Sequence, residues 1–150
     1  MEGSCGEDAT DGGYCGEGVV ELDEAALNRL GTIALDCAFR VHTALGPGLL
    51  ESSYKACLAF ELAQARLSVQ VEVPVPLIYA GQKLASVGYR LDILVGNELV
   101  LEIKAAEGIA PVHRAQLLSY LKLSQRRLGY VLNFNVVSLR DGIARVVNKL

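Results

Sequence analysis

The sequence contains no tryptophan and one methionine, and aromatic residues make up only 6% of its 150 positions. Hydrophobic residues nevertheless make up 51%, so a core must be built from leucine, valine, alanine and isoleucine. No segment approaches the roughly 18 consecutive apolar residues of a membrane span, and the first residues lack the basic and apolar regions of a signal peptide. We therefore expect a cytoplasmic protein that does not enter a membrane.

Lysine and arginine are absent from residues 1–28, which hold eight acidic residues. The remaining residues, 29–150, have 14 basic and 9 acidic side chains and thus a net charge of +5, although the whole chain has a net charge of -3. A basic body is compatible with phosphate-bearing partners. Residues 1–20 are rich in glycine and acids, so we expect a disordered tail there and one domain over residues 21–150.

The four cysteines lack the paired spacing of metal ligands, which makes a zinc or redox site built on them a remote alternative. Cys37 and Cys57 fall on apolar helical stripes, where we expect buried free thiols.

Apolar periodicity predicts the element order α, α, β, β, β, α, β, β. The predicted helices cover residues 23–45, 49–66 and a segment that begins at Pro111, and the predicted strands cover residues 69–75, 88–95, 98–105, 129–133 and 142–147. Pro74 and Pro76 either place the first strand at a sheet edge or end it early, because proline cannot donate a ladder hydrogen bond.

The hairpin over residues 88–104 carries the strongest chemical signal. Gly96-Asn97 is typical of a tight hairpin turn, and alternation places Glu102 and Lys104 on one face of their strand. Asp92 lies in the partner strand, close enough to share a site with Glu102. Two carboxylates beside an amine suit Mg²⁺ or Mn²⁺ and metal-assisted attack on a phosphate. The alternative is a surface hairpin with ordinary outward charges.

Two helical motifs add candidate residues. Glu51 and Tyr54 are neighbours on a helix and could point into one site, but Glu51 could also act only on the helix dipole. His113, Gln116 and Tyr120 share a face of the last helix, where Gln116 and Tyr120 could contact a phosphate or a metal-bound water. The alternative for that pair is a polar helix edge with a half-buried tyrosine.

Together these motifs resemble a known family. Gly48-Leu49-Leu50-Glu51-Ser52-Ser53-Tyr54 matches the signature of the GxxExxY protein family, and Asp92 followed by Glu102-Ile103-Lys104 resembles the Asp…Glu-x-Lys core of the PD-(D/E)XK nuclease superfamily. Gln116-Leu117-Leu118-Ser119-Tyr120 is similar to the Gln-x-x-x-Tyr motif of RecB-like nucleases. Leu91 stands where the superfamily has proline before the aspartate.

The resemblance implies an α/β (α+β) restriction-endonuclease-like fold, in which a mixed sheet is flanked by helices in the order αβββαβ, with an extra N-terminal helix and a C-terminal strand. It implies a Mg²⁺ (or Mn²⁺) site made by Glu51, Asp92, Glu102 and the Ile103 carbonyl. Lys104 would act on the attacking water and the developing charge, and Gln116 and Tyr120 would orient the phosphate or water. We expect substrate contacts from Tyr54, Arg90 and His113.

These features lead to two hypotheses of different classes. The first is a Mg²⁺-dependent nuclease that hydrolyses phosphodiester bonds of DNA or RNA. The second is an inactive module of the same fold that binds nucleic acid or a protein. A homodimer through an exposed apolar helix face is compatible with the high hydrophobic content.

Overall fold

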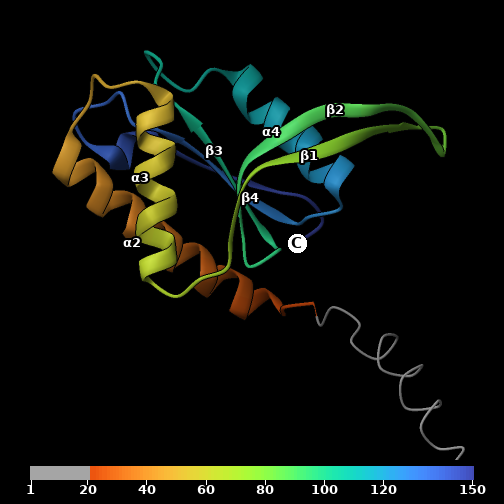
Figure 1. Cartoon of the computed structure of the whole chain (residues 1–150), viewed down its shortest axis with the longest axis horizontal. Coiled ribbons are helices and arrows are strands. Elements are labelled where there is room, and N and C mark those ends of the chain that lie inside the picture. The colour runs from red at the N-terminus through yellow and green to blue at the C-terminus, as the bar shows by residue number, and fades with distance from the viewer. Residues whose placement is uncertain (1–20) are drawn as a thin grey trace, which may run out of the picture.

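The computed structural model describes residues 21–150, apart from the side chains of residues 85–87; the predicted tail over residues 1–20 lies outside this range. Figure 1 shows a twisted sheet with helices on both faces. The sheet contains five strands in the order β1-β2-β3-β4-β5, which are Val69–Tyr79, Gln82–Val95, Leu99–Lys104, Leu128–Asn133 and Ile143–Val147. Among them β3 and β4 run parallel and the other neighbours antiparallel. The predicted mixed sheet is confirmed.

The helices are α2 (Glu24–Leu45), α3 (Glu51–Gln64) and α4 (Pro111–Ser124), and a short 3-10 turn, η1, covers Leu139–Gly142 before β5. From α3 to β4 the order is therefore αβββαβ, with α2 before it and β5 after it, as expected. Asp23 starts α2 as predicted, because its Oδ1 accepts a hydrogen bond of 2.8 Å from the Ala26 N–H. No helix in the described part of the chain has the length and apolarity needed to cross a membrane.

Two hydrophobic clusters hold the helices against opposite faces of the sheet. Strand alternation sends one set of side chains toward α2 and α3, where Leu101 and Leu132 pack with Leu58. The other set meets α4, where Val100 and Val131 pack with Leu117. The side chain of Glu102 lies on the strand face that it shares with Val100, so β3 directs this carboxylate toward α4.

Two tight turns shape the hairpins. Gly96 and Asn97 both have positive φ, +58° and +59°, which is the conformation of the predicted β2–β3 turn. Ala80 and Gly81 close the β1–β2 hairpin in the same way, with φ of +52° and +75°. β1 is an edge strand, as the prolines predicted, and Figure 1 shows this hairpin reaching beyond the rest of the sheet beside α4.

Candidate functional site

The site lies where the β2–β3 ladder stops. The two strands pair at Val95 and Leu99, and the last pair of the ladder joins Ile93 to Leu101. Asp92 and Glu102 come next and would form the following pair, but there the ladder has ended. The backbone N–H groups at this position therefore need other acceptors, because a buried donor without a partner costs free energy.

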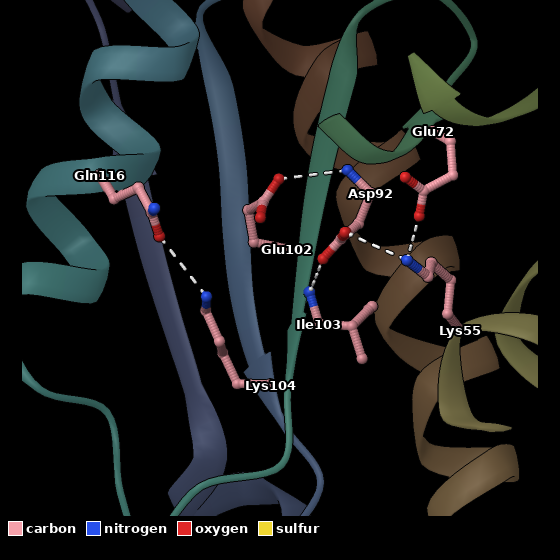
Figure 2. Close-up of polar contacts among 7 residues, drawn as sticks. All are labelled: Lys55, Glu72, Asp92, Glu102, Ile103, Lys104 and Gln116. Atoms are coloured by element: carbon pink, nitrogen blue, oxygen red, sulfur yellow. Dashed lines mark hydrogen bonds and ion pairs between the residues drawn. The ribbon is translucent and has the colours of Figure 1, made fainter. Parts of the chain in front are cut away.

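The two carboxylates supply these acceptors. Asp92 Oδ2 accepts a hydrogen bond of 2.8 Å from the Ile103 N–H, and Glu102 Oε1 accepts one of 3.2 Å from the Asp92 N–H (Figure 2). Side chains thus cross the gap in both directions and hold the two carboxylates beside each other. The Ile103 carbonyl points toward the same strand as its N–H, since both groups of a strand residue face one neighbour.

Simultaneous ionisation of the two carboxylates is unfavourable. Glu102 is only 5% exposed. Burial, followed by repulsion from Asp92, raises the pKa of Glu102 to about 8. Glu102 Oε1 already accepts the Asp92 N–H, so the proton that Glu102 keeps at neutral pH belongs on Oε2.

α4 brings two further predicted residues to the same side of the sheet. Lys104 Nζ donates to Gln116 Oε1 over 3.4 Å, which joins the end of β3 to the second turn of the helix (Figure 2). Tyr120 lies one turn further along, and burial followed by the charge of Glu102 raises the pKa of its phenol. The structure therefore brings Asp92, Glu102, Lys104, Gln116 and Tyr120 together around the end of the ladder.

A groove of about 380 Å³ opens beside Gln116 and Tyr120. Its walls come from α4 and from the β1–β2 hairpin, and they are mostly apolar. Tyr89 lines it with a side chain that is 43% exposed, and the Tyr89 and Tyr120 rings lie 5.4 Å apart. A flat apolar ligand group could therefore pack against exposed aromatic surface next to the carboxylate pair.

A family model described as the PD-(D/E)XK nuclease superfamily matches residues 28–146, which is most of the chain. The chain belongs to the PD-(D/E)XK nuclease superfamily. The matched range contains the Asp92, Glu102 and Lys104 set that the geometry brings together. No curated protein and no solved structure matches the chain.

The donor set of this PD-(D/E)XK site fits a divalent cation. Carboxylate and carbonyl oxygens are the ligands that Mg²⁺ and Mn²⁺ prefer. Asp92 and Glu102 provide two carboxylates whose mutual repulsion a divalent cation would remove. The residues that would hold it are Asp92, Glu102 and, through its carbonyl, Ile103.

Glu51, the third predicted acid, does not complete a cluster with this pair. Among the described residues, no three His, Cys, Asp or Glu side chains gather in a group that could hold a metal ion. Glu51 is the exposed first residue of α3, where its charge favours the helix dipole. Its contribution to a metal site therefore stays a prediction.

The α3 residue that contacts the carboxylate pair is Lys55, which the sequence analysis did not single out. Lys55 of α3 hydrogen-bonds to Glu72 Oε1, and its Nζ lies 3.3 Å from Asp92 Oδ1 (Figure 2). Burial lowers the pKa of Lys55, but the contacts with Glu72 and Asp92 outweigh this effect and leave that pKa raised. The available signal was helical spacing, because Lys55 follows Glu51 by one turn on the same face.

Tyr54 requires a correction. Its side chain is fully buried and stacks on Phe134, with ring centroids 4.6 Å apart. The hydroxyl donates to the Gly46 carbonyl over 2.6 Å and accepts the Leu49 N–H over 3.0 Å. Tyr54 thus anchors the loop before α3 and has no surface for substrate.

His113 and Arg90 have different environments. The His113 Nδ1 accepts the Ala110 N–H over 3.0 Å and so caps the first turn of α4. Arg90 is exposed on β2, two residues before Asp92. Substrate contacts by these two residues stay predictions.

Proposed function

We propose that this protein is a Mg²⁺- or Mn²⁺-dependent nuclease that hydrolyses phosphodiester bonds of DNA or RNA. The observation that carries the proposal is the end of the β2–β3 ladder beside Lys104, where Glu102 accepts the Asp92 N–H and Asp92 accepts the Ile103 N–H. The GxxExxY signature over residues 48–54 makes membership of that narrower family part of the same proposal.

Each side chain has a distinct part in this chemistry. A divalent cation, when bound, polarises the phosphate and lowers the pKa of a water molecule. Asp92 and Glu102 would hold the cation, and Glu102 would have to lose its proton to serve as a ligand. The Lys104 ammonium stabilises negative charge that develops on the phosphate, and Gln116 fixes where that ammonium points. Tyr120, beside them, contacts the phosphate or the water.

The groove beside Tyr120 supports a nucleic-acid substrate. A base could stack on the exposed Tyr89 ring, since stacking on aromatic side chains tolerates every base. We expect a base stacked there to bring its phosphate toward the carboxylate pair, because Tyr120 lines the groove and lies beside Glu102.

A second candidate function is nucleic-acid binding without turnover. A pocket of about 710 Å³ at the C-terminal end of α4 gathers four basic side chains, namely Lys122, Arg126, Arg127 and Lys149. Within residues 21–150, the hydrogen bonds of Arg126 go to neutral oxygens of Asn97 and Ser124, so no carboxylate of this range pairs with its charge. Phosphate contacts at this pocket would give affinity without chemistry.

Calorimetric titration of Mn²⁺ and Mg²⁺ tests the first proposal. We expect the native protein to bind a cation and Asp92→Asn/Glu102→Gln to lose that binding, while the substitutions retain both hydrogen-bond acceptors and therefore the fold. A parallel assay with labelled single- and double-stranded DNA and RNA should show cation-dependent cleavage only by the native protein. Equal cleavage by both proteins would refute the assignment, and nucleic-acid binding without cleavage by either would favour the second candidate.

A further inference from the structure

Lys55 lies between two carboxylates at the α3 side of the proposed site. Its Nζ stands between two carboxylates, Asp92 at 3.3 Å and Glu72, and the Lys55 and Asp92 side chains are only 19% and 17% exposed. An ion pair with this much burial is less screened by solvent than a surface pair. Lys55 comes from α3, on the sheet face opposite to α4. The carboxylate pair therefore has a lysine on each side, Lys55 and Lys104.

The two oxygens of Asp92 are already engaged. Oδ2 accepts the Ile103 N–H and Oδ1 faces Lys55. The Ile103 contact is part of the backbone arrangement and fixes the carboxylate in the gap. The Lys55 contact involves a flexible side chain, so Oδ1 is the oxygen that another cation could take over.

Glu72 provides a second partner for the Lys55 ammonium. It lies in β1 between Val71, which pairs with Ile93, and Val73, which pairs with Leu91, and so stands opposite Asp92. The backbone at Glu72 has a φ of +54°, a left-handed conformation that is costly for a residue with a side chain. Lys55 can thus leave Asp92 and still keep an ion pair with Glu72.

We propose that Lys55 is an internal counterion of Asp92 that competes with the divalent cation of the proposed nuclease site. The positive charge of Lys55 compensates Asp92 in the cation-free protein, and cation binding requires Lys55 to withdraw to Glu72. Lys55 therefore lowers the cation affinity of the site. This inference rests on the proposed function in so far as the competitor is a divalent cation.

Calorimetric titration with Mn²⁺ measures the competition directly. Lys55→Met keeps most of the apolar stem and removes the charge, and we expect it to bind Mn²⁺ roughly fivefold or more tightly than the native protein. Lys55→Arg retains the charge and should stay within about twofold of the native affinity. Lys83→Met, at an exposed lysine near the tip of the β1–β2 hairpin, controls for the general loss of one positive charge.

The double-mutant cycle with Glu72→Gln tests the withdrawal step. In the native background Glu72→Gln removes the second carboxylate partner of Lys55, so that Asp92 is the remaining one. Mn²⁺ affinity should therefore fall by about twofold or more. In the Lys55→Met background much of that effect should disappear, because there is no longer an ammonium with which Glu72 could pair. Additive effects of the two substitutions would contradict the role of Glu72.

The remaining outcomes separate this inference from the proposed function. Mn²⁺ binding by Lys55→Met but not by the native protein would support the inference strongly. Native binding with an unchanged Lys55→Met affinity, or an equal gain in Lys83→Met, would overturn the inference and leave the nuclease proposal standing. Absence of binding in every variant would overturn both. Thermal unfolding adds a second readout, since saturating Mn²⁺ should raise the Tm of Lys55→Met more than that of the native protein.

Discussion

The two ends of the β2–β3 pair use the same strands for different purposes. At the closed end, from Ile93 to Leu101 through the Gly96-Asn97 turn, backbone groups pair with each other and the side chains are almost all buried and apolar. At the open end, one residue further on, carboxylates replace backbone acceptors. The polar side chains of the closed end, Asn97 and Glu98, are bound by Arg126 and Arg127, whereas the open end holds two acids side by side. A site arises here because the ladder stops.

The flanks of the open end also differ. On the α4 side, Lys104 is held by the neutral amide of Gln116, so its charge is directed but not cancelled. On the α3 side, Lys55 is neutralised by Glu72 and Asp92. Our proposal therefore assigns the first lysine to a substrate phosphate and the second to the protein's own carboxylates. Three substitutions test these differences.

The largest effect should follow substitution of the lysine on the α4 side. Lys104→Met removes the ammonium next to the carboxylate pair, and loss of one preorganised electrostatic contact of this kind reduces turnover by about 100- to 1000-fold. Cation affinity should stay the same or rise, because Lys104 is no ligand. Single-turnover cleavage with calorimetry on the same sample measures both. Cleavage within tenfold of the native rate would show that Lys104 does not stabilise the transition state.

An apolar substitution at the closed end should act on stability alone. Leu101 is fully buried among α2, α3 and the sheet, so Leu101→Ala should lower the free energy of unfolding by about 2–5 kcal/mol. Urea denaturation measures this loss. Mn²⁺ affinity below the unfolding transition should change little, although Leu101 and Glu102 are adjacent. A large drop in affinity without a drop in stability would show that the two ends are not separate.

A smaller effect concerns pH. In the cation-free protein the pKa of Glu102 is about 8, whereas the unfolded chain releases this proton near the ordinary glutamate pKa of 4.5. Because the folded state binds this proton more tightly, the Glu102 contribution is fully present below pH 4.5 and is lost as pH rises toward 8. Glu102→Gln keeps the acceptor for the Asp92 N–H and removes the titration.

We therefore expect the stability of Glu102→Gln, relative to that of the native protein, to increase by roughly 3–4 kcal/mol between pH 5 and pH 8. Urea denaturation at both values, with chelator present, measures the difference. Parallel stability profiles for the two proteins would show that the Glu102 carboxyl is not perturbed. Cation affinity of the native protein should rise with pH over the same interval, since binding releases the proton.

Much of the architecture and part of the site followed from local sequence. Period-two alternation placed Glu102 and Lys104 on one strand face, and the Gly96-Asn97 turn set Asp92 opposite them. Helical spacing likewise joined Gln116 to Tyr120. These relations depend on residues within one hairpin or one helix, where the geometry of the chain fixes which side chains are neighbours.

Other features depended on how the elements pack. The Gly-x-x-Glu-x-x-Tyr motif suggested an acid and an aromatic in one site, but packing buries Tyr54 against Phe134 and leaves Glu51 exposed. In the α4 pocket, Lys122, Arg126 and Arg127 are close in the sequence, whereas Lys149 joins them only because the chain returns along β5.

Local sequence is enough to predict the alternating strands, their turn and the acid–acid–lysine set, because each follows from short-range backbone geometry. The end of the ladder at Asp92 and the contact of Lys55 with Glu72 and Asp92 there depend on tertiary packing. α3 and β1 are brought to Asp92 by the packing of a helix on a sheet and by strand register. No spacing along the chain encodes the distance between an ammonium on a helix and a carboxylate on a strand.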